Sequence, residues 1–173
     1  MTALLLVRHG ETDWNADGRL QGQTDRPLSE FGRRQATQLA EDLADEGLEA
    51  IYSSDLARAR ETAEILGARL GLPVVLDPDL REKDWGTWEG LTSVERDRVE
   101  FVGESTEAHQ ERILRALRRI SERHPGEGRV LVVTHGGSMR RVQTAALGLA
   151  LPVVENCGRW LCAYDDGTFR AVS

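Results

Sequence analysis

The sequence predicts an α/β protein, a three-layer α/β/α sandwich around a mostly parallel central sheet. Short, continuous apolar runs alternate along the chain with longer segments in which apolar residues recur at helical spacing. This alternation is typical of parallel strands joined by helices that cover both faces of the sheet. The chain has 173 residues, and no repeat, linker or low-complexity segment divides it, so we expect one domain over residues 1–173.

The strands are predicted from apolar and β-branched runs. Residues 4–7 and 129–135 form continuous runs of the kind found in strands that are covered on both faces. Shorter runs predict strands at 50–54 and 73–77. From 156 to 172 the chain predicts strands around an Asp-Asp-Gly turn.

Helical spacing of apolar residues predicts the helices between these strands. The first follows Ser29 as its N-cap and stops at Gly47, and the second follows Asp55 as its cap and runs to Gly71. Two further helices are predicted. One runs from 105 to about 124 and is ended by HPGEG, and the other covers 138–149.

Composition excludes several classes of protein. The formal net charge is −7 and no basic tract occurs, so we expect no nucleic-acid partner and no anionic membrane face. No apolar stretch is long enough to cross a bilayer and no signal-like segment begins the chain, so the expected location is the cytoplasm. A site for an anionic ligand must therefore be formed by a local group of residues and not by the overall charge of the chain.

Cysteine and lysine carry little functional information in this sequence. Cys157 and Cys162 form no CxxC pair and have no histidines nearby, which predicts free thiols in structural roles and neither a zinc pattern nor a disulfide framework. Lys83 is the only lysine among 22 basic residues. We attribute this bias to codon usage or growth temperature and not to function.

Two of the apolar runs end in a histidine. His9 follows the first run, and His135 ends the run near residue 130. Because ligands of open α/β sheets bind beyond the carboxyl ends of the strands, we expect these two histidines to meet there. Taken alone, a histidine at a strand end is also compatible with a structural or solvated role. The other two histidines, His109 and His124, are expected to be solvated.

Arginine and histidine at the same place favour phosphoryl transfer. The planar guanidinium group of Arg8 suits phosphate oxygens, and the imidazole of His9 can act as nucleophile, proton carrier or hydrogen-bond donor. A metal site needs several neutral histidines or carboxylates, and the charge of Arg8 disfavours a cation beside His9. We therefore expect neither a metal nor a cofactor.

Several sequence blocks follow one another in a fixed order: LVRHGETDWN, RLQGQTDRPLSEFGRRQA, YSSDLARARETA, LREKDWGTWEG, GES and VVTHGG. In this order they resemble the histidine phosphatase superfamily, whose members include phosphoglycerate mutases. RHG alone would be weak evidence, but independent blocks that coincide at compatible spacings are strong evidence. The blocks cover most of the chain from Leu4 to about Arg140, and the resemblance implies a phosphoglycerate mutase-like fold.

The resemblance implies a role for each matching residue. His9 is the nucleophile that becomes phosphorylated, and Arg8 binds the phosphate beside it. Arg58 and His135 complete the phosphate pocket. Glu82 is the general acid that protonates the leaving oxygen and later assists the attack of water. Further phosphate or substrate contacts are implied at Thr12, Asn15, Gln21, Gly22 and Gly136.

These implied roles agree with the chemistry of the side chains. Two arginines and a protonated histidine can stabilise charge on the equatorial phosphate oxygens without a metal. Glu82 needs a pKa raised by burial or by the bound anion, whereas His9 must keep one ring nitrogen unprotonated, so we expect a bell-shaped pH profile. Gly10 is expected to let the backbone turn close to the phosphate.

Several of these residues have structural alternatives. Arg58 lies among other arginines and many acids, so a surface ion pair is the competing interpretation. Glu82 has Asp79, Asp84 and Glu89 as neighbours, any of which can be a solvated charge. Three tryptophans are expected to pack under the site loops and not to form substrate platforms; they are Trp14, Trp85 and Trp88.

The segment after the acid bears on the type of reaction. Mutases of the family carry a longer insertion there, with a tyrosine close behind the acid, whereas this segment is short and has Trp85 at that position. A short segment leaves the pocket open to water, so we expect hydrolysis of a small phosphomonoester. A phosphoglycerate mutase-type transfer and a non-catalytic phosphate-binding module stay open as alternatives. The sequence has no signature for the individual substrate or the oligomeric state.

Overall fold

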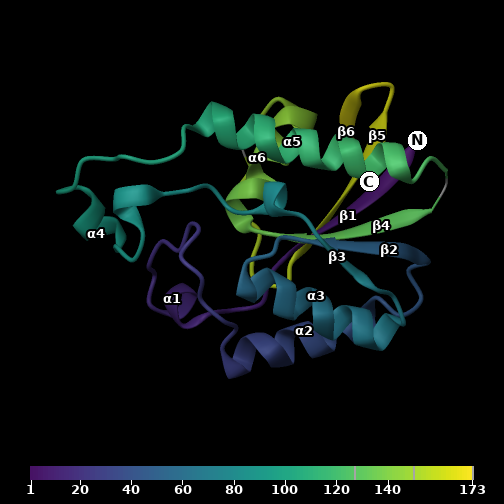
Figure 1. Ribbon diagram of the computed structural model, residues 1–173, viewed down its shortest axis with the longest axis horizontal. Helices are drawn as coiled ribbons and strands as arrows, with labels where there is room; N and C mark the ends of the chain where they lie inside the picture. Colours follow the sequence, from purple (N-terminus) through teal and green to yellow (C-terminus); the bar gives the residue numbers. More distant parts are fainter. Residues whose placement is uncertain (127, 150, 173) are drawn as a thin grey trace.

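A six-stranded sheet forms the centre of the fold in a computed structural model, which describes residues 1–126, 128–149 and 151–172 (Figure 1). Its strand order is β3-β2-β4-β1-β5-β6. β3, β2, β4 and β1 are parallel, whereas β5 runs antiparallel to both β1 and β6. The strands are β1 (Thr2–Arg8), β2 (Leu48–Ser53), β3 (Val74–Leu76), β4 (Arg129–Thr134), β5 (Arg159–Asp165) and β6 (Thr168–Ala171).

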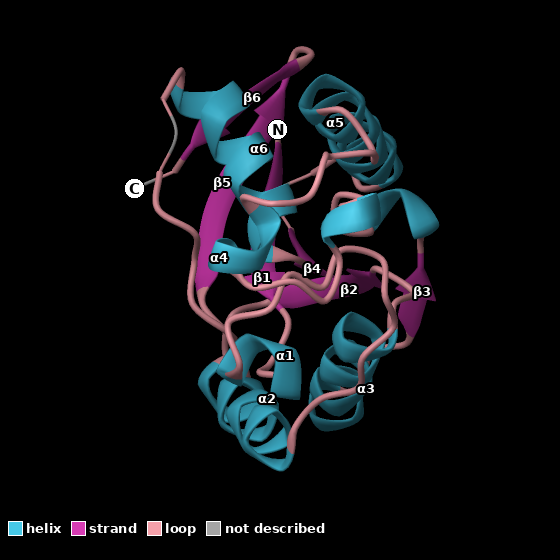
Figure 2. Ribbon diagram, turned by 90° about the vertical axis from the view of Figure 1, so that its left-hand side faces the viewer, coloured by secondary structure: helices cyan, strands magenta, loops and turns pink. Residues whose placement is uncertain are grey.

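Helices cover both faces of this sheet (Figure 2). α2 (Glu30–Asp42) and α3 (Ala57–Leu70) lie on one face, and α5 (Thr106–Arg123) and α6 (Gly136–Leu147) lie on the other. The predicted three-layer sandwich with a mostly parallel sheet is therefore confirmed.

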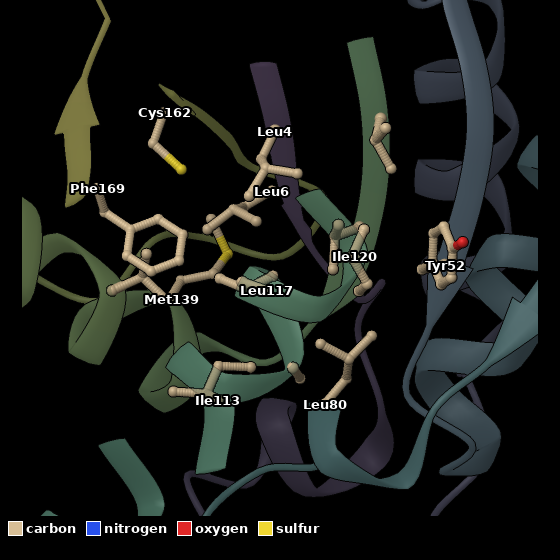
Figure 3. Packing of buried hydrophobic residues seen from close by; sticks show 14 residues of the cluster. Leu4, Leu6, Tyr52, Leu80, Ile113, Leu117, Ile120, Met139, Cys162 and Phe169 are labelled. Carbon is tan, nitrogen blue, oxygen red and sulfur yellow. The ribbon is translucent and has the colours of Figure 1, made fainter. Parts of the chain in front are cut away.

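The continuous apolar run of β1 is explained by burial on both of its faces. Leu4 and Leu6 belong to the apolar cluster under α5 and α6, whereas Leu5 and Val7 belong to the cluster under α2 and α3. Leu117 of α5 belongs to the same cluster as Leu4 and Leu6 (Figure 3). Each such side chain contributes roughly 1.5–3 kcal/mol when it is fully buried, so the central strands hold the three layers together.

The helix after Ser29 begins as predicted but ends earlier. The Ser29 hydroxyl accepts the N–H of Gly32 at 3.0 Å, which is an N-cap hydrogen bond. The helix ends at Asp42, before the predicted stop at Gly47. Gly47 has a φ of +64° and lies in the loop that leads into β2, so it shapes that loop and does not end the helix.

The predicted capping role of Asp55 is wrong. Its carboxylate binds the guanidinium group of Arg81 through two hydrogen bonds of 2.7 and 2.5 Å. The cap of α3 comes from the preceding site loop, where Asp25 accepts the N–H of Ala57 at 2.7 Å. Gly71, with a φ of +69°, ends the helix as predicted.

The C-terminal helices and the hairpin agree with the sequence pattern. α5 ends at Arg123, directly before HPGEG, in which Glu127 lies outside the described residues. α6 begins two residues earlier than predicted, at Gly136. The turn between β5 and β6 has positive φ angles at Asp166 and Gly167, which suits a tight hairpin.

Short helices occupy the loops beyond the carboxyl ends of the parallel strands, and the sequence pattern did not predict them. α1 is capped by the side chain of Thr12. The segment that carries α4 extends away from the sheet (Figure 1). These helices are α1 (Asp13–Ala16), η1 (Pro78–Leu80), η2 (Gly86–Trp88) and α4 (Ser93–Arg96).

Truncation of a buried residue tests the packing between α5 and the sheet. Leu117→Ala removes atoms from a fully buried site and should lower the free energy of unfolding by about 2–5 kcal/mol. Val94→Ala is the matched control, because Val94 on α4 is 67% exposed and its truncation should change stability by less than about 0.5 kcal/mol. Chemical denaturation of both variants measures the difference, and equal effects would contradict the described core.

Candidate active site

A cavity of about 300 Å³ opens beyond the carboxyl ends of β1 and β4, where α6 begins. This is the edge at which the sequence analysis expected a ligand. Its volume suits a small metabolite. Of the residues predicted for the site, those that line the cavity are Arg8, His9, Asn15, Gln21, Gly22, Arg58, Glu82 and Gly136.

His9 presents an unprotonated ring nitrogen. Its Nδ1 lies 2.7 Å from the carbonyl oxygen of Gly10, so Nδ1 carries the proton and donates it to that acceptor. Nε2 then carries the lone pair, and it accepts a hydrogen bond from Nε of Arg58 at 3.3 Å. Burial, followed by the charges of Arg58 and Arg8, lowers the pKa of His9 well below its usual 6.5, so the ring is neutral at pH 7.

Arg58 is a buried cation beside this nitrogen. It is fully buried, and it donates hydrogen bonds to the carbonyl oxygens of Gly22 and Thr24. Burial lowers its pKa to about 10, which leaves it protonated at pH 7. Among the described residues it has no carboxylate within 4 Å, so the alternative of a surface ion pair is wrong.

Arg8 supplies a second cation with a free donor. One guanidinium N–H donates to the carbonyl oxygen of Val154 at 2.7 Å. Its Nε is buried and has no partner among the described residues. Buried N–H groups are nearly always hydrogen-bonded in folded proteins, so an unpartnered one at the wall of a cavity indicates an anionic ligand.

Glu82 is held at the cavity by backbone amides. Its two carboxylate oxygens accept the N–H groups of Lys83 and Gly137, each at 2.8 Å. A Cβ atom at residue 137 would lie 2.4 Å from this carboxylate, so a larger residue there would displace Glu82 from its present position. Arg112, which pairs with Glu104 of the GES block at 2.8 Å, also donates to the carbonyl oxygen of Glu82.

The acidic neighbours of Glu82 have other partners. Glu89 accepts the backbone N–H groups of Gln23 and Thr24, and Asp79 pairs with arginines of α5. The Asp84 carboxylate accepts the N–H of Gly86. Glu82 is the one carboxylate among the residues that line the cavity, so of these four acids it alone is placed for proton transfer there.

His135 lies behind the cavity wall. It is fully buried, and its ring centroid lies 5.2 Å from that of His9. Its Nε2 lies 2.9 Å from the hydroxyl of Ser54, while Nδ1 is buried without a partner among the described residues. Burial and the charge of Arg58 lower the pKa of His135 well below 6.5. The ring is therefore neutral at pH 7, whereas the sequence analysis expected a protonated histidine.

Thr12, for which a contact was predicted, and Gly10 both have structural roles. Thr12 is fully buried and does not line the cavity; its hydroxyl caps α1 and donates to Gln21 at 2.8 Å, which positions that residue at the wall. Gly10 has no positive φ, so its backbone does not use the left-handed conformation that favours glycine. A Cβ at residue 10 would lie 2.6 Å from the carbonyl oxygen of Gly32, so this glycine allows close packing against α2.

Sequence reasoning missed His109. It was expected to be solvated, but it is 2% exposed and its Nε2 lies 2.9 Å from the hydroxyl of Ser138 and 3.7 Å from Glu82. Its burial could have been predicted from its position one turn before Ile113, on the apolar face of α5. The other histidine with this expectation, His124, is half-buried and lies 3.0 Å from the hydroxyl of Tyr52.

The sequence analysis also failed to predict that Trp85 and Lys83 line the cavity. Trp85 stacks on Trp88 with ring centroids 6.1 Å apart, as expected of packing, but it lines the cavity as well. Lys83, which we attributed to composition alone, is buried and lines the same cavity. Trp14 packs against Gly90, in agreement with the prediction.

The sequence that carries this site matches a known family along nearly its whole length. The model of the "Histidine phosphatase superfamily (branch 1)" matches residues 4–173. The chain belongs to the histidine phosphatase superfamily. The family predicted from the sequence blocks is therefore confirmed, and its members supply the comparisons for this site.

Similar proteins of the superfamily include both phosphatases and mutases. The metal-independent phosphoserine phosphatase of Arabidopsis thaliana is 40% identical over 161 residues, which cover 82% of this chain and 67% of that protein. The probable phosphoglycerate mutase GpmB of Cronobacter sakazakii is 41% identical over 165 residues, covering 86% and 76% of the two chains. The solved structure of a mycobacterial glucosyl-3-phosphoglycerate phosphatase in complex with VO3 has a TM-score of 0.89 at 32% identity, covering 98% and 96%.

Neither a membrane-spanning helix nor a metal-binding cluster occurs among the described residues. Within these residues, no helix combines the length and apolar character needed to cross a membrane. In the same part of the chain, no three or more histidine, cysteine or acidic side chains gather in a group that could hold a metal ion.

The buried histidines should make the protein less stable in acid. His9, His109 and His135 each have a pKa lowered chiefly by burial, whereas in the unfolded chain each titrates near 6.5. As the pH falls through 6.5 the unfolded chain binds protons that the folded protein does not bind. The free energy of unfolding should therefore fall, by up to about 1.4 kcal/mol per pH unit for each histidine.

Denaturation between about pH 7.5 and pH 5.5 in wild-type protein and in His109→Gln measures this effect. The glutamine amide can still donate to Ser138, and the variant should show a shallower fall in stability because it has one buried imidazole fewer. Identical slopes for the two proteins would contradict the lowered pKa of His109.

Proposed function

We propose that this protein is a metal-independent phosphomonoester hydrolase that acts through a phosphohistidine at Nε2 of His9. The observation that carries the proposal is the hydrogen bond from His9 Nδ1 to Gly10, which leaves Nε2 unprotonated beside Arg58. A neutral imidazole with a free lone pair is the form that attacks phosphorus. Glu82, in the same cavity, supplies the acid that the leaving group needs.

In the first step of this mechanism Arg8 and Arg58 bind the phosphate oxygens, and Nε2 of His9 attacks phosphorus. The bond from Nε2 to phosphorus forms while the ester bond breaks, and protonated Glu82 gives its proton to the leaving oxygen. The two guanidinium groups stabilise the charge that spreads over the equatorial oxygens. The alcohol then leaves the cavity, and Glu82 is a carboxylate.

In the second step water attacks the phosphohistidine. The Glu82 carboxylate takes a proton from this water as the new bond to phosphorus forms and the bond to Nε2 breaks. Inorganic phosphate leaves, and Glu82 is protonated again, so the cycle consumes one ester and one water. The predicted contact of His135 with a phosphate oxygen stays part of the proposal: its buried Nδ1 has no partner among the described residues, and its ring centroid lies 5.2 Å from that of His9.

A mutase is the second candidate, and the 41% identity to a probable phosphoglycerate mutase favours it. The length of the segment from Glu82 to Glu104 favours hydrolysis, because it carries only the short helices η2 and α4 and the cavity stays open to water. Activity on a small phosphomonoester is shared by both candidates. What separates them is whether the phosphoryl group passes to water or back to the substrate.

A panel of small phosphomonoesters with EDTA present throughout separates these possibilities. We expect release of inorganic phosphate that EDTA does not reduce, because the two arginines take the place of a metal. Loss of activity in EDTA that added metal restores would overturn metal independence. Interconversion of 2- and 3-phosphoglycerate after priming with 2,3-bisphosphoglycerate, without release of phosphate, would make the protein a mutase.

Replacement of His9 tests the nucleophile. His9→Ala should lower kcat by about a thousandfold or more, because the variant lacks the nitrogen that attacks phosphorus in the proposed mechanism. His124→Ala is the matched control, since His124 lies outside the cavity lining and its loss should leave turnover unchanged. Substantial activity in His9→Ala would remove His9 as the nucleophile.

The intermediate itself can be trapped with labelled substrate. Glu82→Gln lacks both the acid of the first step and the base that activates water, so the label is supplied on an ester whose leaving group needs no acid, such as p-nitrophenyl phosphate. With this substrate the variant should accumulate labelled protein. Denaturation must be alkaline, because acid hydrolyses phosphohistidine. Absence of label from the variant under these conditions counts against a covalent intermediate.

A further inference from the structure

His109 is a buried histidine to which the proposed reaction gives no role. It is 2% exposed, and it lines the cavity from α5. Its Nε2 lies 2.9 Å from the hydroxyl of Ser138 and 3.7 Å from Oε1 of Glu82. Among the described residues, no other lysine, arginine or histidine side chain comes within 4 Å of the Glu82 carboxylate. A histidine so close to the proposed acid can change how that acid works.

The hydrogen bonds around His109 place its proton on Nε2. The Ser138 hydroxyl donates its one proton to the carbonyl oxygen of Arg81 at 3.2 Å, so it accepts a hydrogen bond from Nε2. The opposite tautomer would direct the lone pair of Nε2 toward Oε1 of Glu82, and lone pairs on the two atoms repel each other. The N–H group at Nε2 therefore lies between two acceptors, one on Ser138 and one on Glu82.

The imidazole of His109 is neutral at pH 7, although charged groups surround it. Burial is the largest effect on its pKa and lowers it below the usual 6.5. The carboxylates of Glu82 and Glu104 raise this pKa, whereas the cations of the second pair, Arg112 and Lys83, lower it. These groups come from the loops on either side of η2 and α4 and from α5 itself, and α6 contributes an uncharged hydroxyl. A neutral N–H group thus faces the acid.

Glu82 changes its charge twice in each cycle of the proposed reaction. It becomes a carboxylate when the leaving oxygen takes its proton, and the attacking water protonates it again. The amides of Lys83 and Gly137 each donate to one of its oxygens, which leaves a further lone pair on Oε1 open to another donor. The guanidinium groups of Arg8 and Arg58 and the ammonium group of Lys83 act on this carboxylate from beyond 4 Å.

We propose, on the basis of the proposed hydrolase function, that His109 is a positioning residue for Glu82 and stabilises its carboxylate through the N–H group at Nε2. While Glu82 holds its proton, this N–H donates to Ser138. When the leaving oxygen has taken the proton, the negative charge draws the N–H toward Oε1, and the ring keeps its own proton throughout. The distance of 3.7 Å is longer than a hydrogen bond, and a small turn about χ2, which varies broadly in histidine, would shorten it.

The pH profiles of two esters test this proposal. The leaving group of glycerol phosphate needs an acid, so the alkaline limb of its kcat/KM reports loss of the proton from Glu82. In His109→Leu this limb should move to higher pH by at least about 0.5 unit, because the carboxylate has lost a donor. The leaving group of p-nitrophenyl phosphate needs no acid, so its profile should not shift in this way. An unmoved limb for glycerol phosphate, a move to lower pH or an equal shift with both esters would overturn the proposal.

Two further variants separate this role from packing, with thermal unfolding as the check of folding. His109→Gln keeps an amide N–H near the position of Nε2, so its alkaline limb should lie close to that of the wild type. Ile113→Val is the matched control, because Ile113 is buried on the same face of α5 but lies outside the cavity lining, and its limb should not move. If either variant moved the limb as far as His109→Leu does, the donor role of His109 would be overturned.

Nuclear magnetic resonance separates this proposal from the hydrolase proposal, because it needs no turnover. In the wild type, the ring nitrogen shifts of His109 should show the neutral tautomer with its proton on Nε2 at pH 7, and the opposite tautomer would overturn the proposal. The carboxyl carbon signal of Glu82, assigned through Glu82→Gln, should titrate at higher pH in His109→Leu than in the wild type. If this shift is found but no ester is hydrolysed, the role of His109 stands and the hydrolase proposal fails. Hydrolysis by the wild type without this shift overturns the role of His109 alone.

Discussion

The hydrogen bond from Nδ1 of His9 to the carbonyl oxygen of Gly10 determines which atom of the site can react. Because this nitrogen carries the proton, the lone pair lies on Nε2, the atom that faces Arg58. Burial and the neighbouring cations keep the ring neutral. The carbonyl group of Gly10, two residues beyond the end of β1, thus selects the tautomer, and the nitrogen that we propose as the nucleophile is already unprotonated.

The guanidinium groups around this nitrogen are hydrogen-bonded to backbone carbonyls, and the carboxylates that stabilise their charge, above all that of Glu82, act from beyond 4 Å. Arg58 donates to the carbonyl oxygens of Gly22 and Thr24, and Arg8 donates to that of Val154. Carbonyl dipoles offset part of the cost of burying a guanidinium group without cancelling its charge. The positive charge of the two guanidinium groups stays available to an anion. A chain with a negative net charge can thus form the phosphate site that we propose. The same loops fix the cavity wall, so charge and shape depend on one set of contacts.

Much of the fold was predictable because its signals are local. The β1 and β4 runs are apolar on both faces, and Ser29 and Gly71 mark helix ends through short-range hydrogen bonding and backbone conformation. Errors arose where the partner is distant in sequence. Asp55 lies at the expected capping position but binds Arg81, while the cap comes from Asp25, and no local pattern distinguishes these two acids.

The order of residues alone was sufficient for the family, the three layers and the strand ends that bear His9 and His135, because motif spacing and apolar periodicity are properties of the chain. Tertiary structure decided that His135 lies behind the wall and is neutral, and that His109 is buried beside Glu82. It also placed Lys83 in the lining of the cavity. These outcomes depend on how helices rotate against the sheet and on how far each charge is removed from water, and both are set by packing between segments that are distant in sequence.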